Sequence, residues 1–146
     1  MKTKGMKPFE SAEEVEAVAR GFESCATSPD AFGHREHLAL ALCYLTQGDA
    51  GRALGRVRDG IYKFLRHHGE DPAGVYNETV TIFWLRRVQS FLDTHRGART
   101  LDERANALLA ACGDSKVIYV YYSRGRLSSE EARVGWVEPD LKPLDF

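Results

Sequence analysis

Two histidines stand at the start of a strongly apolar stretch. His34 and His37 open the segment GHREHLALALCYL, residues 33–45, which otherwise reads as a core helix. Residues three and four apart share one face of a helix, so both imidazoles continue the stripe of Leu38 and Ala41. Imidazole titrates near neutral pH and binds metals, so the pair indicates acid–base chemistry, ligand contact or metal ligation. The competing interpretation is structural, with His34 as a helix cap and His37 as a hydrogen-bonding core residue.

A second group of polar side chains lies in YNETVTIFW, residues 76–84. Asn77 and Thr81 are one helical turn apart, and Glu78 lies beside them. Capping and the helix dipole alone would also favour Asn77 and Glu78 near a helix start. Buried polar groups need partners, so the two groups together would form a polar pocket if the fold brings them to one place.

Counting residues along the predicted helical hairpins indicates that the fold brings the two polar groups to one place. Short loops make consecutive helices antiparallel neighbours, and each residue rises about 1.5 Å along a helix. The count places three pairs of residues at equal heights along the bundle axis: Asn77 with Leu65, Thr81 with Ile61, and His37 with Asp59. His68 falls one or two turns further out. The histidine pair and the Asn77–Thr81 turn are therefore expected at the same end of a helical bundle.

The predicted pocket supports three classes of function. The first is binding of a small molecule, with or without catalysis, in which His37 acts as general acid or base and Glu78 orients it. An arginine of YYSRGRL could bind a ligand carboxylate through two hydrogen bonds. The second is a metal-dependent enzyme with two histidines and a carboxylate as ligands, a less favoured interpretation because HxxH is common by chance. The third is a structural or interaction protein without an active site. The predicted ligand contacts are His34, Asn77, Thr81 and Arg124; the predicted metal ligands are His34, His37 and Glu78.

Apolar periodicity and capping signals predict only helices. Capping boxes at SAEE, residues 11–14, and TLDE, residues 100–103, start two of them, and Asp49 caps a third. A longer helix is expected from about Val75 to His95. The segment SKVIYVYYS, residues 115–123, has strand-like composition, but without a second strand it is interpreted as a short helix. One more turn or short helix is expected at SSEEAR. Trp136, Val137 and Leu141 of the extended tail are expected to pack on the bundle.

These elements predict an all-α fold. We expect a flexible arm over residues 1–8 and a single domain over residues 9–146, with about four main helices, short C-terminal helices and an extended tail. The formal net charge of −1 favours neither nucleic acid nor an anionic membrane as a partner. The chain shows no secretory signal and no apolar run long enough to span a bilayer, and its three scattered cysteines fit reduced thiols in the cytoplasm. The sequence leaves the oligomeric state open.

Three segments resemble an uncharacterised family of small bacterial all-helical proteins with the pattern HxxHL, Y(H/N)xTxT, YSxxRL and PDLxPL. They are FGHREHLALALCYL, YNETVTIFWLRRV and YYSRGRLSSEEARVGWVEPDLKPL. His34, His37, Thr79 and Thr81 match this pattern by position, whereas Asn77 stands where the family usually has histidine. The resemblance implies no reaction. It favours a functional pocket over a structural one, and it disfavours zinc or iron here because asparagine is a poor ligand for those metals.

Overall fold

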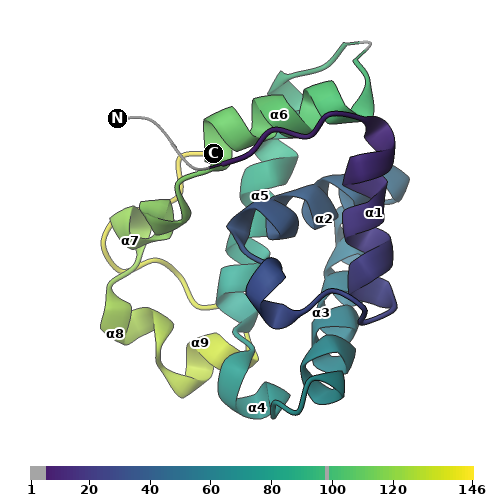
Figure 1. Cartoon of the computed structure of the whole chain (residues 1–146). Coiled ribbons are helices and arrows are strands. Elements are labelled where there is room, and N and C mark those ends of the chain that lie inside the picture. The colour runs from purple at the N-terminus through teal and green to yellow at the C-terminus, as the bar shows by residue number, and fades with distance from the viewer. Residues whose placement is uncertain (1–5, 98) are drawn as a thin grey trace.

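A computed structural model describes residues 6–97 and 99–146, and the part of the chain that it describes is helical and contains no strand. Figure 1 shows the long helices packed as a bundle, with the short C-terminal helices at one side. The all-α prediction is confirmed, with five long helices among the described residues in place of about four. The long helices are α1 (Ala12–Glu23), α2 (His34–Gln47), α3 (Ala50–His67), α5 (Glu78–Thr94) and α6 (Leu101–Cys112). The short ones are α4 (Pro72–Val75), α7 (Ile118–Tyr121), α8 (Arg124–Leu127) and α9 (Glu130–Val134), with 3₁₀ turns at Pro29–Ala31 and Ser115–Val117.

The predicted caps define the starts of the long helices. The Ser11 hydroxyl accepts from the Glu14 amide at 3.1 Å, although the Glu14 carboxylate binds the amide of Glu10 and not that of Ser11. At α6 both hydrogen bonds of the capping box form between Thr100 and Glu103. Each cap satisfies backbone donors that the first helical turn leaves without partners, so local chemistry sets these boundaries.

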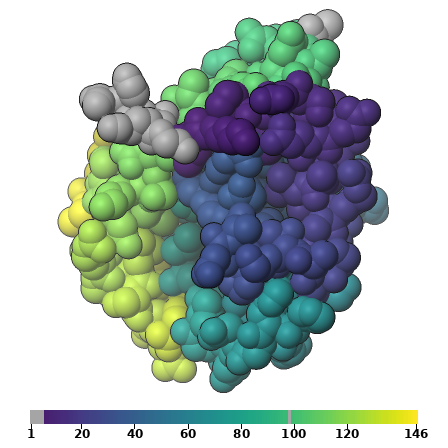
Figure 2. All heavy atoms as spheres, viewed as in Figure 1, coloured from purple at the N-terminus to yellow at the C-terminus, as the bar shows by residue number. Residues whose placement is uncertain are grey.

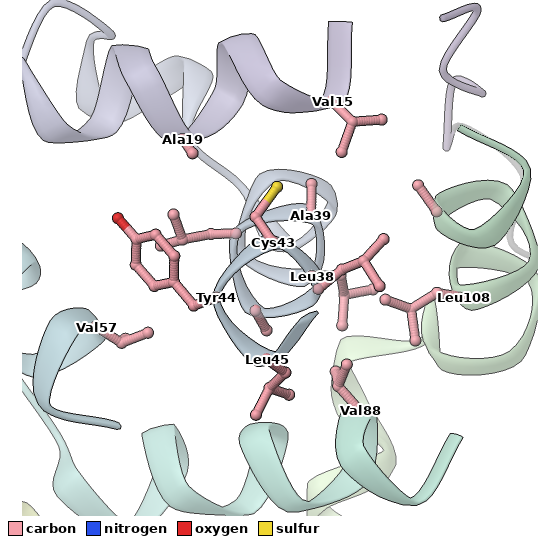
Figure 3. Close-up of a cluster of buried hydrophobic side chains, with 14 of the residues drawn as sticks. Val15, Ala19, Leu38, Ala39, Cys43, Tyr44, Leu45, Val57, Val88 and Leu108 are labelled. Atoms are coloured by element: carbon pink, nitrogen blue, oxygen red, sulfur yellow. The ribbon is translucent and has the colours of Figure 1, made fainter. Parts of the chain in front are cut away.

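α2 is the central helix of the main hydrophobic core. All eight residues from Leu38 to Leu45 are buried, so the helix is covered on every side. Figure 3 looks along this helix and shows side chains of four neighbours around it: Val15 and Ala19 of α1, Leu108 of α6, Val88 of α5 and Val57 of α3. The first turn of α2, which carries His34 and His37, is not buried. The two histidines therefore lie where the surrounding layer of helices ends.

A second apolar cluster lies on the other side of α5. Phe83 is fully buried there against Ile118, Tyr121, Tyr122 and Leu127. α5 thus contributes to both clusters, in agreement with its apolar residues on more than one side. Figure 2 shows the C-terminal segment, green to yellow, covering one side of the molecule beside the earlier helices. The short helix predicted within residues 115–123 is confirmed as α7 after a 3₁₀ turn, whereas α8 was not predicted.

The predicted helix from Val75 to His95 is wrong at its start. The chain forms α4, becomes extended at Tyr76 and begins α5 only after Asn77. Asn77 is the N-cap of α5, and its Oδ1 accepts from the amide of Val80 at 3.0 Å. Asparagine at this position favours a helix start over a helix interior, because its short side chain binds the nearby backbone.

The tail packs on the bundle, but not through all the predicted residues. Trp136 and Val137 are partly buried against the second cluster as expected. The prediction for Leu141 is wrong: this side chain is 57% exposed, and Leu144 and Phe146 pack on the cluster instead. The backbone explains the difference, because the Leu141 amide donates to the carbonyl of Tyr121 and so fixes the chain while its side chain faces outward.

Residues 1–5 of the predicted N-terminal arm lie outside the described residues. The described part of the arm contacts the bundle: Met6 packs on the main core, and the Lys7 carbonyl accepts from Nε of Arg35 at 2.6 Å. Among the helices that the model describes, none is both long enough and apolar enough to cross a bilayer.

Candidate functional site

A cleft with two lobes lies at the N-terminal end of α2, bounded by α2, α3 and α5. The lobes have volumes of about 340 and 320 Å³ and are lined mostly by aliphatic and aromatic side chains. Trp84 and His34 line the first lobe, whereas Tyr76 and Asn77 line the second. Both lobes are bounded by the same five residues, which form the junction of the cleft: Phe32, His37, Ile61, Val80 and Thr81.

His37 is the polar side chain at the centre of this cleft. The residue is exposed, and because it lines both lobes, its exposed surface faces the cleft. Its ring meets Phe32 edge-on, with 4.7 Å between ring centroids, and neither nitrogen forms a hydrogen bond with any described residue. Desolvation by the surrounding protein, aided by repulsion from His34 and opposed by Glu36, lowers the pKa of His37 from 6.5 to about 4. At neutral pH the ring is therefore uncharged, with one N–H donor and one lone-pair acceptor.

His34 is held in one tautomer by the end of α6. Its Nε2 lies 2.9 Å from the carbonyl oxygen of Cys112, and a carbonyl can only accept, so Nε2 carries the hydrogen. The ring also packs edge-on against Trp84, with 4.6 Å between centroids. Desolvation lowers the pKa of His34, although the Cys112 carbonyl and Asp114 act in the opposite direction. In the neutral ring, Nδ1 is left as an acceptor.

Asn77 and Thr81 lie in the cleft as predicted, but part of their hydrogen-bonding capacity is already used. The Asn77 amide nitrogen donates to the carbonyl of Leu127 at 2.8 Å, while its oxygen caps α5. The Thr81 hydroxyl donates to the Asn77 carbonyl at 3.1 Å. Asn77 is therefore mainly structural, whereas the Thr81 oxygen keeps lone pairs that can accept a hydrogen bond.

Glu78 does not join the histidines. It is buried, and its carboxylate accepts two hydrogen bonds from the Arg58 guanidinium, at 3.0 and 2.5 Å, and one from the Tyr76 hydroxyl at 2.6 Å. Hydrogen bonding to Arg58 lowers the pKa of Glu78 against the effect of burial. Glu78 lines neither lobe, so it does not orient His37 in this structure.

The predicted metal-ligand set of His34, His37 and Glu78 does not form. Among residues 6–97 and 99–146 there is no group of three histidine, cysteine, aspartate or glutamate side chains that could hold a metal ion. The physical reason lies in the carboxylate, because Arg58 and Tyr76 engage both Glu78 oxygens.

Arg124 and Thr79 lie outside the cleft. The Arg124 guanidinium stacks over the ring of Tyr119, 4.1 Å from its centroid, and Arg124 lines neither lobe. Thr79 is fully buried; its hydroxyl donates to the Gly135 carbonyl at 2.6 Å and accepts from the Val137 amide at 3.2 Å. Thr79 therefore joins α5 to the C-terminal tail, which gives this family-pattern residue a structural role.

Sequence reasoning missed the apolar part of the site. Phe32, Ile61, Val80 and Trp84 line the cleft, yet each reads as ordinary core in the sequence. Two signals were available: the count set Ile61 level with Thr81, and the adjacent aromatic residues Phe83 and Trp84 point to different faces of a helix. His68, expected further out in the pocket, lines neither lobe; its ring packs on Phe64, 4.6 Å between centroids.

No protein-family model, curated protein or solved structure significantly matches this chain. The resemblance to small bacterial helical proteins therefore stays a prediction, and the function has to be argued from the cleft itself.

Proposed function

We propose that the protein binds a small, largely apolar molecule in the cleft at the start of α2, with His37 as the principal hydrogen-bonding partner. The observation that supports this proposal most strongly is the position of the His37 ring. It lies at the junction of two apolar lobes, and neither ring nitrogen is paired with a described residue. Ligand sites are commonly apolar concavities with a few polar groups that fix orientation.

A purely structural role explains these contacts less well. A histidine that fixes helix positions is expected to hydrogen-bond another part of the chain, as His34 does with Cys112. His37 instead makes an edge contact with Phe32 and leaves its polar atoms unpaired. The surrounding protein keeps its ring uncharged at neutral pH, a state in which it can both donate to and accept from a ligand.

A neutral fluorescent probe tests the proposal directly. N-phenyl-1-naphthylamine becomes brighter in apolar surroundings, and we expect a saturable increase on titration into the wild-type protein. Ile61→Trp should abolish it, because Ile61 lines both lobes and the larger side chain would fill their junction. Leu54→Trp is the matched control, since Leu54 is a partly buried residue of the same helix that lines neither lobe. Equal binding by both variants would contradict the proposal, provided that thermal melts show both to be folded.

His37→Gln separates binding from folding. Within the described residues, His37 loses only its edge contact with Phe32, so we expect the free energy of unfolding to change by about 1 kcal/mol, the scale of one aromatic contact. Probe affinity should fall clearly, because an aromatic ring that lines both lobes is lost along with its nitrogens. A loss of several kcal/mol in stability, with no probe binding to the wild type, would show that His37 is a structural residue.

A further inference from the structure

The two lobes carry no formal charge. None of their lining side chains is a lysine, arginine, aspartate or glutamate. The carboxylate of Glu36, which lies between the two histidines in the sequence, accepts from the Gly33 amide at 2.9 Å and from Arg35 at 2.8 Å, so it is already paired. A charged ligand that enters the cleft would therefore lose hydration without meeting an opposite charge.

The polar atoms left in the cleft are mostly acceptors. His34 uses its only N–H on the Cys112 carbonyl, which leaves Nδ1 as an acceptor. The Thr81 hydroxyl hydrogen is used on the Asn77 carbonyl, which leaves the oxygen lone pairs. His37 supplies one further acceptor and one N–H donor, and the indole N–H of Trp84 has no hydrogen bond to a described residue. A ligand group that donates and also accepts suits this set.

We infer that the cleft selects an uncharged molecule whose hydroxyl group sits on an apolar, ring-containing body. This inference rests on the proposed function and specifies its ligand class. The hydroxyl would lie at the junction, where His37 and Thr81 line both lobes. The ligand hydroxyl would donate to an unprotonated imidazole nitrogen, and its oxygen could accept a hydrogen bond from the N–H of His37. The ring body would occupy the first lobe beside Trp84 and Phe32.

Related functional groups fit this arrangement less well. A carboxylate at neutral pH only accepts, so it would face the lone pairs of His34 and Thr81 without a counter-charge. An ether also only accepts, and it would leave the same lone pairs unpaired after excluding water from them. Sites that hydrogen-bond a substrate hydroxyl reject analogues that lack it for this reason.

Three ligands with one carbon skeleton test the inference. Binding of 2-naphthol, 2-methoxynaphthalene and 2-naphthoate would be measured by calorimetry at pH 7. We expect 2-naphthol to bind about tenfold more tightly than the methyl ether, the scale of one hydrogen bond, and the carboxylate to bind most weakly. In His37→Phe this preference of the hydroxyl over the ether should largely disappear. His67→Phe is the control, because His67 is an exposed histidine that lines neither lobe.

The outcomes distinguish the two proposals. Equal affinity for the hydroxyl and the ether, or tightest binding of the carboxylate, would overturn the inferred ligand class and leave the proposed binding function standing. Binding of N-phenyl-1-naphthylamine without binding of any naphthalene derivative would also overturn the ligand class alone. Failure of all four compounds to bind would overturn both proposals.

Discussion

The imidazole Nε2 of His34 donates a 2.9 Å hydrogen bond to the carbonyl oxygen of Cys112, which joins the first turn of α2 to the last residue of α6. The Cys112 carbonyl belongs to the last turn of a helix, where backbone acceptors have no partner within the helix. A single side chain thus satisfies a helix end, fixes its own tautomer and forms part of the cleft wall. His34 and His37 consequently differ: His34 is hydrogen-bonded to the end of α6, whereas neither ring nitrogen of His37 is paired with a described residue.

This hydrogen bond predicts a difference between two substitutions of His34. Phenylalanine has a similar shape but no donor, so His34→Phe should lower the free energy of unfolding by about 1 kcal/mol. His34→Gln should lower it less, because a glutamine amide can reach the same carbonyl. Urea denaturation of both variants measures the difference. Equal stability of the two would show that the Cys112 contact contributes little.

Glu78 is predicted to act on stability and not on binding. Glu78→Gln would replace a carboxylate that Arg58 and Tyr76 contact, and we expect a loss of about 1.5–3 kcal/mol, the range for hydrogen bonds to charged groups. Probe affinity should stay within about twofold, or about 0.4 kcal/mol, because Glu78 lines neither lobe of the cleft. Glu70→Gln is the control, since Glu70 is exposed. A large loss of affinity with unchanged stability would restore Glu78 to the functional site.

The positions of Thr81 and Asn77 show what helix counting can predict. The count set Thr81 level with Ile61 and Asn77 level with Leu65, and both pairs do line the cleft together. Height along a bundle follows from the rise per residue, which is nearly constant. The count also put His37 level with Asp59, and His37 lines the first lobe together with Val57 and Ile61, the residues of α3 on either side of that level.

The partners of the polar residues could not be predicted in this way. Glu78 binds Arg58, which is twenty positions earlier in the chain, and the choice depends on side-chain reach and rotation about the helix axis. Asn77 shows the opposite case. Its type and the acidic residue after it were a readable signal for a helix start, yet the helix was expected to begin at about Val75.

The pH dependence of the free energy of unfolding should also report the lowered pKa of His37. Its pKa falls from 6.5 in the unfolded chain to about 4 in the folded protein, so between these values the unfolded state binds more protons. The contribution of the uncharged His37 ring to the free energy of unfolding is therefore complete above about pH 6.5. It is lost progressively as the pH falls towards 4. The pKa of His34 is lowered as well, so it contributes with the same sign.

His37→Gln should flatten this acid limb of the stability curve without removing it, because His34 remains. Urea denaturation of wild type and variant at intervals between pH 4 and 7 gives the two slopes. Parallel slopes would mean that His37 titrates near its ordinary value, and the description of a desolvated, uncharged ring in the cleft would then be wrong.

The last prediction concerns two leucines of the same tail, three residues apart. Leu144 packs against the cluster around Phe83 and Tyr122, whereas the side chain of Leu141 is 57% exposed. Leu144→Ala should lower the free energy of unfolding by about 1–2 kcal/mol, less than for a fully buried leucine because Leu144 is only partly buried. Leu141→Ala should change it by less than about 0.5 kcal/mol, as is usual for surface substitutions. The comparison removes the same atoms from the same segment, so it isolates packing from any general effect of shortening a side chain. Equal losses from both variants would contradict the described path of the tail and would favour the original expectation that Leu141 packs on the bundle.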